Sequence, residues 1–243
     1  MSISNQILRP KLITPGNNSY DAVIMADRPM VYYPRIDHAA VKDASGHGYT
    51  GSISGSYITN ERGPWSSVSS AALDGSSAYV STPYLSGIGI FTLECWLETA
   101  VQQGAIFAIS SGASLSTTAY QASYFVSSGN AYNGILNTND SQDGAAGSFE
   151  WDFSTWHYTA FQFSLNVVCQ QVVDSRIDTA SSATSALDAG YVTFGAGSMG
   201  GWYNQNGNYV KGRIAACAVY DRILSVPDML RHYNAGRTAL RLA

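Results

Sequence analysis

The sequence predicts an all-β protein built as a two-sheet antiparallel sandwich, with one short C-terminal helix and an extended N-terminal arm. Three observations predict this fold. Apolar and polar residues alternate along Phe91–Glu98, which is the period of a strand with one buried face. Short alternating runs recur between clusters of Gly, Ser and Asn. Charged residues make up only 12% of the chain, so hydroxyl and amide side chains supply much of its polarity.

Residues 1–20 are predicted to form the arm, and residues 21–243 a single folded domain. Prolines and a Gly-Asn-Asn turn signal leave the arm without periodicity, so we expect it to be either disordered or docked on a partner. No linker-like run divides the rest of the chain. We find neither a basic start followed by an apolar run nor a window apolar enough to span a membrane. We therefore expect a soluble protein with no signal peptide and no membrane insertion.

The expected elements follow in order along the chain. A short helix or turn at 21–27 precedes a strand at 30–35, and a polar turn around Asp43 leads into a strand at 50–54. Leu73–Val80 and Phe91–Glu98 are expected to be a pair of strands around which the sandwich is organised. Further strands are predicted at 105–110, 120–127, 134–137, 156–163, 167–174, 190–195 and 212–220.

The C-terminal helix has recognisable start and stop signals. Ser225 is a good N-cap, and Asp228 lies three residues further on, as in a capping box. Gly236 is expected to end the helix. Met229, Leu230 and Tyr233 would share one face, with which the helix is expected to close one end of the sandwich.

Four successive motifs resemble those of laminin-G-like, concanavalin A-like jelly-roll domains: Tyr32–Ile36, Asp43–Gly51, Leu73–Val80 and Phe91–Leu97. Later segments fall in the order that this family uses, so the resemblance implies a jelly-roll sandwich. Small proteins of this kind are familiar among the virion proteins of tailed bacteriophages. The resemblance therefore implies a virion surface protein (a decoration, fibre or minor tail component) that is oligomeric or particle-bound and is attached to virion structural proteins through its arm.

The strand Phe91–Glu98 also carries the first candidates for catalysis. Glu94, Trp96 and Glu98 share its polar face, which we expect to be open to water or to a ligand. A retaining glycosidase needs two carboxyl groups about 5–5.5 Å apart, whereas Glu94 and Glu98 are separated by roughly 13 Å along a strand. We therefore expect no catalytic site here. Glu94 is expected to bind a loop, and Trp96 to pack beneath that loop.

A glycan-degrading enzyme, or a carbohydrate-binding module of a bacterial extracellular system, is the alternative. The catalytic acids would then come from distant strands and loops, for example Asp140, Asp143, Glu150 and Asp152. Two carboxylates within about 6 Å across an open groove would favour hydrolysis, and a groove of aromatic and amide groups would favour binding.

No cofactor is required by any motif, but the resemblance implies a structural calcium ion. Asp43 and Asp74 lie in polar turns and are its candidate ligands. The family often has an Asp-Glu pair in its last long strand, where this chain has Ala215-Ala216. The alternative is that both aspartates form Asx turns with their own backbone. The three cysteines, Cys95, Cys169 and Cys217, lie in apolar runs and are expected to be buried free thiols.

The loop Gly197–Tyr209 is the predicted ligand-binding surface. Its aromatic rings and amides suit a host-surface glycan, or a protein partner. The residues in question are Trp202, Tyr203, Asn204, Asn206, Asn208 and Tyr209. The segment Ser123–Asn139 is a second candidate, and both could instead be plain hairpin loops. A net charge of −4 with only three lysines argues against nucleic acid as a partner.

Overall fold

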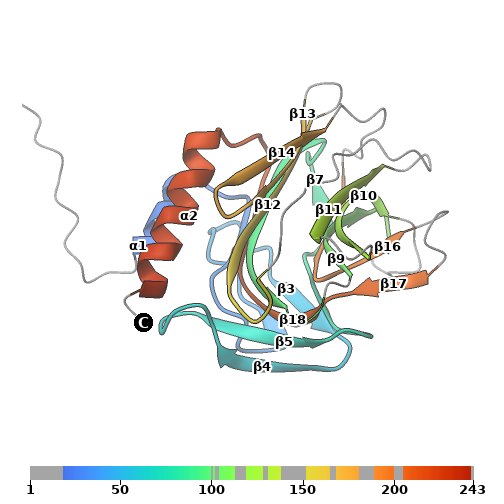
Figure 1. The fold of residues 1–243 in the computed structure, drawn as a ribbon, viewed down its shortest axis with the longest axis horizontal. Helices are drawn as coiled ribbons and strands as arrows, with labels where there is room; N and C mark the ends of the chain where they lie inside the picture. Colours follow the sequence, from blue (N-terminus) through green and yellow to red (C-terminus); the bar gives the residue numbers. More distant parts are fainter. Residues whose placement is uncertain are drawn as a thin grey trace, which may run out of the picture.

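The computed structural model describes residues 19–99, 101, 104–112, 119–127, 131–137, 152–164, 168–180, 189–199 and 205–241. Within these ranges the chain forms two antiparallel sheets, a separate two-stranded hairpin and two helices. Figure 1 shows the layers, with the helices on one side of the first sheet and the second sheet on the other. The two-sheet antiparallel sandwich that the sequence predicts is confirmed. Residues 1–18, which form most of the predicted arm, lie outside the described ranges.

The first sheet has β8 and β18 at its centre. Its order is β14 (Arg176–Ala180), β13 (Val168–Val173), β12 (His157–Ser164), β8 (Ile90–Thr99), β18 (Lys211–Tyr220), β5 (Ser69–Asp74) and β4 (Tyr57–Arg62), and β1 (Val31–Tyr33) pairs with the far end of β18. Because β8 and β18 have neighbours on both sides, they are buried along most of their length. This sheet carries the residues discussed below.

The second sheet forms the other half of the sandwich. Its order is β11 (Ala131–Asn137), β10 (Ala119–Ser127), β9 (Ala105–Ser110), β15 (Ala189–Phe194), β6 (Tyr79–Ser81), β3 (Gly51–Ser54) and β2 (Ala40–Val41), with β7 (Leu85–Ser86) on β15. The hairpin of β16 (Ala196–Met199) and β17 (Gln205–Tyr209) lies against β9.

One apolar core lies between the two sheets. The odd-numbered residues of β8 face it, as their alternation predicts. They meet the aromatic rings of β12 and β15, among them Phe161, Phe163 and Phe194, all of which are buried. This core is the apolar interior expected of a sandwich.

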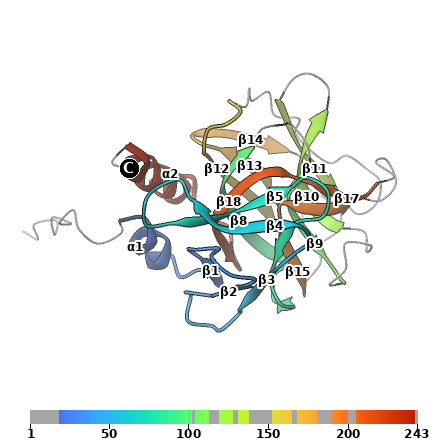
Figure 2. The ribbon, with the colours of Figure 1, turned by 90° about the horizontal axis from the view of Figure 1, so that it is seen from below.

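A second apolar core lies on the opposite face of the first sheet, under the two helices. Helix α1 (Ser19–Ala26) and helix α2 (Val226–Arg241) lie side by side (Figure 2). Tyr20 and Ile24 of α1 and Met229 of α2 are fully buried against the aromatic residues of this face. At the start of α2, Ser225 Oγ accepts a hydrogen bond from the amide of Asp228, which confirms the predicted cap.

The predicted strand pair Leu73–Val80 and Phe91–Glu98 is wrong in its connectivity. Gly75 adopts a φ of 78° and the chain turns there, so that residues up to Asp74 belong to the first sheet and residues from Tyr79 to the second. In addition, β18 lies between β5 and β8. The stretch therefore links the two sheets, and the true partners of β8 are β12 and β18.

Gly236 lies inside α2 and does not end it, which corrects the prediction from the sequence. A Cβ atom at this position would lie only 2.2 Å from Cζ2 of Trp96. The glycine is therefore needed for the close approach of the helix to the indole ring, and α2 continues to Arg241.

Substituting Gly236 by alanine is expected to destabilise the protein, although alanine favours isolated helices. The overlap with Trp96 should lower the free energy of unfolding by about 1–3 kcal/mol, as measured by urea denaturation. The matched control is Asn234→Ala on the exposed face of the same helix, which should stay within about 0.5 kcal/mol of the wild type. A more stable Gly236→Ala variant would contradict the close packing.

Candidate functional site

The polar face of β8 is closed over most of its length, which corrects the expectation that it is open to water or ligand. Thr92, Glu94 and Trp96 are buried, and only Glu98 is partly exposed. The cover consists of α1, α2 and the Trp65 side chain, whose ring lies 5.4 Å from that of Trp96. Trp96 therefore packs beneath helices and an indole.

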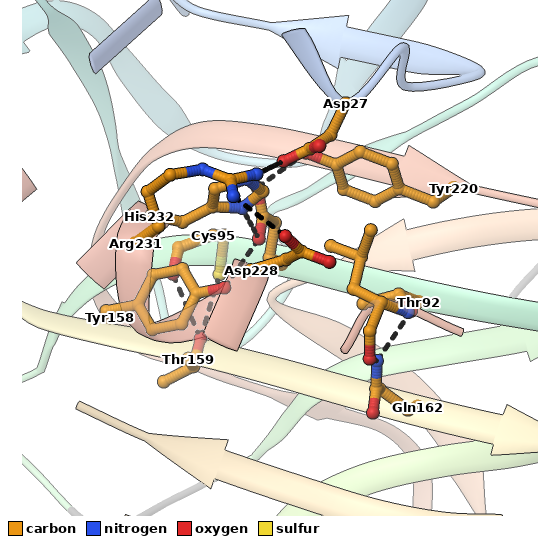
Figure 3. Close-up of polar contacts among 12 residues, drawn as sticks. Asp27, Thr92, Cys95, Tyr158, Thr159, Gln162, Tyr220, Asp228, Arg231 and His232 are labelled. Atoms are coloured by element: carbon orange, nitrogen blue, oxygen red, sulfur yellow. Dashed lines mark hydrogen bonds and ion pairs between the residues drawn. The ribbon is translucent and has the colours of Figure 1, made fainter. Parts of the chain in front are cut away.

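Glu94 is a fully buried carboxylate with three side-chain partners. The Tyr158 hydroxyl donates a hydrogen bond of 2.5 Å to Oε2, and the Tyr220 hydroxyl one of 2.9 Å to Oε1. Nδ1 of His232 lies 2.9 Å from Oε2. These partners come from β12, β18 and α2, so the expectation that Glu94 bonds a loop is wrong. Figure 3 shows how the tyrosines and His232 converge.

His232 connects two carboxylates. Its Nε2 lies 2.6 Å from Oδ2 of Asp27, just beyond α1, and Arg231 also pairs with Asp27. An imidazole that faces a carboxylate at each nitrogen must donate from both, and only the imidazolium form can do so. Burial opposes this charge, but Glu94 and then Asp27 outweigh burial and raise the pKa of His232.

This network is suited to holding elements together and not to turnover. Glu94 and His232 have no exposed side-chain surface. All the partners named above are protein groups, and a substrate could reach them only if α2 left the sheet. Breaking such a buried pair leaves an uncompensated charge, so the network fixes the position of both helices.

The uncovered end of the same face lies at Glu98. Its Oε2 forms a 2.5 Å ion pair with Nη2 of Arg213, the residue opposite it on β18. The Arg213 guanidinium lies over the Trp156 ring at 5.5 Å, and its Nη1 donates to the carbonyl of Arg62. These contacts lead from the closed face to the surface around β4 and β5.

A surface groove of about 430 Å³ lies beside Arg62. It is lined by residues from the end of β4, the turn that follows, the start of β5 and the segment after β1: Arg35, Asp37, Asn60, Glu61, Arg62, Trp65, Ser66, Ser67, Val68 and Ser69. We call it the β4–β5 groove. Its volume falls within the range of small-molecule sites.

The lining of the β4–β5 groove mixes polar and apolar side chains and is held to the body of the protein by several contacts. Nε of Arg35 donates to the carbonyl of Ser67, and the Trp65 ring packs 4.7 Å from the ring of Tyr20. Trp65 Nε1 and Ser69 Oγ are buried without a hydrogen-bond partner among the described residues. The Arg35 hydrogen bond and the packing of Trp65 on Tyr20 anchor the lining of the groove, whereas the two buried atoms have no surface that a ligand could reach.

Three charged side chains that line the β4–β5 groove have no partner within the described ranges. Asp37, Glu61 and Arg62 form neither a side-chain hydrogen bond nor an ion pair there. By contrast, Glu98 and Arg213 are bound to each other. Sequence reasoning missed this groove because its residues come from two distant segments, and the Gly-Pro turn signal at 63–64 indicates a turn but no cavity.

The predicted ligand loop is only partly described. Trp202, Tyr203 and Asn204 lie outside the described residues, and Asn206 and Asn208 are placed only as part of β17. Tyr209 is partly buried, and its ring lies 6.5 Å from that of Tyr79 on the second sheet. Asp140, Asp143 and Glu150 also lie outside the described ranges. This loop therefore stays a prediction.

Asp43 forms the Asx turn that the sequence offers as the alternative to calcium binding. Its carboxylate accepts hydrogen bonds from the amides of Tyr32, Ser45 and Tyr49 and from the Ser45 hydroxyl. Burial opposes ionisation, but these bonds outweigh it and lower the pKa of Asp43.

Asp74 is held in the same way. Its two oxygens accept five hydrogen bonds from Ser76, Ser77 and Ala78, and the serine bonds outweigh burial and hold the pKa of Asp74 well below its usual range. A Ca²⁺ at either aspartate would have to replace such bonds. Among the described residues, no group of three or more His, Cys, Asp or Glu side chains is arranged to hold a metal.

Comparison with known protein families and with curated proteins gives no match. Solved structures do match. The binding domain of botulinum neurotoxin DC, in complex with rat synaptotagmin II, has a TM-score of 0.62 at 12% identity, covering 87% of this chain and 52% of that one. Domain 4 of the GH43 arabinanase AbnA from Geobacillus stearothermophilus, in complex with arabinotriose, has a TM-score of 0.57 at 14% identity, covering 85% and 98%.

Trypanosoma rangeli sialidase in complex with sialic acid has a TM-score of 0.61 at 10% identity and covers 86% of this chain and 33% of that one. The chain thus spans about half of the neurotoxin binding domain and a third of the sialidase. At these identities the likeness shows the fold alone, a jelly-roll β-sandwich. None of the helices in the described ranges has the length and apolar character needed to cross a membrane.

The charge on His232 predicts a pH-dependent stability. Because its pKa is raised in the folded state, its contribution is fully present below about pH 6.5 and is lost as the pH rises through the folded value. The pKa of His157 is also raised, because the neighbouring Asp174 outweighs the effect of burial, so His157 contributes to the free energy of unfolding with the same pH dependence. The free energy of unfolding should therefore fall as the pH rises above about 6.5, as followed by urea denaturation. His232→Gln should flatten this slope and the exposed His38→Gln should not; an unchanged slope in His232→Gln would refute the bridging role.

Proposed function

We propose that the protein is a non-catalytic carbohydrate-binding protein that binds a saccharide in the β4–β5 groove. The observation that carries the proposal is that Asp37, Glu61 and Arg62 line one groove and have no side-chain partner among the described residues. Sugar hydroxyl groups both donate and accept hydrogen bonds. The groove offers complementary groups. The Asp37 and Glu61 carboxylates accept hydrogen bonds, the Arg62 guanidinium donates them, and the amide of Asn60 does both.

The architecture supports this proposal, because the groove lies at the end of a strand pair, where β4, the turn after it and the segment after β1 meet on the surface of a packed sandwich. The similar structures support it as well. The arabinanase domain is described in complex with arabinotriose and the sialidase with sialic acid. A further neurotoxin of type C, with a TM-score of 0.62 at 13% identity, is described as interacting with two ganglioside molecules. The 197–209 loop is the second surface on which the same function could reside.

Glycoside hydrolysis in the same groove is the second candidate function. Two acids, Asp37 and Glu61, line the groove, and paired carboxylates are what such enzymes use. Hydrolysis on the polar face of β8 is disfavoured, because Glu94 is locked under the helices and Glu98 is paired with Arg213. Reducing-end release from a bound oligosaccharide that is lost in Glu61→Gln would establish the enzyme and overturn the non-catalytic proposal.

Removal of groove side chains is expected to weaken glycan binding without unfolding the protein. For an oligosaccharide selected on a glycan array, Arg62→Ala should raise the Kd about tenfold or more, because a charge-assisted hydrogen bond is lost. Calorimetry and a thermal melt of each variant would measure this. The matched control is Arg237→Ala on the exposed face of α2, which should bind as the wild type does.

Two outcomes would contradict the groove assignment. If Arg62→Ala and Glu61→Gln keep wild-type affinity while Trp202→Ala abolishes it, the site is the 197–209 loop. If no glycan binds the wild type at all, carbohydrate binding itself fails. Equal losses in the Arg62→Ala and Arg237→Ala variants would show that the effect does not come from the groove.

We further propose that the module is displayed on a phage virion, with residues 1–18 bound to virion structural proteins. The resemblance to phage jelly-roll proteins supports this role. The start of the folded body supports the boundary, because α1 begins at Ser19 and Tyr20 is fully buried against Trp65. The proposed attachment segment is therefore taken as residues 1–18, within the arm 1–20 that the sequence predicts.

A chain that begins at Ser19 is expected to keep its Tm and its glycan affinity but to lose incorporation into particles. Truncation beyond Tyr20 would instead remove a core side chain. Co-sedimentation with virions after expression during infection would measure incorporation, with the full chain as the control. Equal incorporation of both chains would show that the arm is not the attachment.

A further inference from the structure

Two free thiols lie on the two central strands of the first sheet. Cys95 is on β8 and Cys217 is on β18, and both are fully buried in the core between the sheets. Both belong to the same apolar cluster. Although 122 residues separate them in sequence, the sheet therefore places them on the same face.

A β-bulge brings the two cysteines opposite each other. Trp96 is paired with Ala215 and Glu94 with Ala218, so Cys95 faces the extra residue on β18 and Cys217. Ala216 has a φ of 50° and turns to the helix side with Ala215, which returns Cys217 to the sandwich core. In a regular ladder without the extra residue, the alternation would not place these side chains together.

The position of the two cysteines across one pair of antiparallel strands is compatible with a covalent bond. Residues directly opposite each other on antiparallel strands have Cα atoms about 4.5–5.5 Å apart, and disulfides span Cα distances of about 4.4–6.8 Å. The third cysteine, Cys169, is on β13, which β12 separates from β8. The fold therefore selects one pair from the three possible ones.

The chemistry of the two thiols determines when the bond could form. Burial, followed by the neighbouring Cys95 thiol, raises the pKa of Cys217, so its reactive thiolate is scarce in the folded protein. Cys95 Sγ also lies 3.2 Å from the hydroxyl oxygen of Thr159. Oxidation is therefore expected while β8 and β18 are paired but not yet covered by the second sheet.

We propose that Cys95 and Cys217 form a disulfide site, closed during folding in an oxidising medium, and that this site is independent of the proposed glycan function. The two thiols together lose two protons and two electrons as the Sγ–Sγ bond forms. A small-molecule disulfide, such as oxidised glutathione, accepts them and is reduced to two thiols. The disulfide covalently links β8 and β18, the two central strands against which both apolar cores pack.

The test is refolding of the full chain from urea with either oxidised or reduced glutathione, followed by peptide mass mapping without reduction. A Cys95–Cys217 linked peptide should dominate after oxidative refolding. The oxidised protein should have a Tm higher than the reduced protein by about 5 °C or more.

The Cys169→Ala variant is the matched control, because it should form the same linked peptide and show the same Tm shift. Cys217→Ala should abolish both. The inference fails if links to Cys169 dominate, if oxidative refolding leaves all three thiols free, or if the linked protein melts below the reduced one. Should Cys217→Ala fail to fold, the Cys169→Ala result decides alone.

Discussion

The arrangement of the molecule depends on one buried carboxylate, that of Glu94. A charge without access to water is costly unless every oxygen is satisfied. The groups that satisfy it come from β12, β18 and α2, and His232 extends the contact to Asp27 beside α1. One side chain therefore links the centre of the first sheet to both helices. The aromatic packing around Trp96 adds apolar contact to this link.

The closure of this face has a consequence for function. A sandwich can offer ligands the open face of a sheet, but here the helices occupy most of that face. The polar groups that remain accessible lie at its margin, where β4 and β5 meet the segment after β1. A binding role is thus compatible with a sheet whose central acid is committed to stability, because the two occupy different parts of the molecule.

Period-2 alternation was sufficient to predict most strands, and the strand at Ala105–Ser110 was predicted with its observed bounds. This alternation cannot distinguish a polar residue that faces water from one that faces a buried partner. It therefore leads to the wrong prediction that the face carrying Glu94 is open. The partners of Glu94 lie more than 60 residues away in sequence. The prediction that Gly236 ends the helix is wrong for a related reason. In sequence, a glycine that ends a helix cannot be told from one inside a helix that lets an aromatic ring pack closely against the backbone. The β4–β5 groove joins segments that no local pattern connects.

The contact between Gly236 and Trp96 also bears on how the chain is made. A glycine in the middle of α2 weakens the isolated helix, so α2 depends on the sheet for much of its stability. This helix follows every strand of the sandwich in sequence. During translation, the part of the aromatic surface that α2 covers therefore stays exposed until α2 has left the ribosome. In that interval the nascent chain exposes a hydrophobic patch of the kind that chaperones bind.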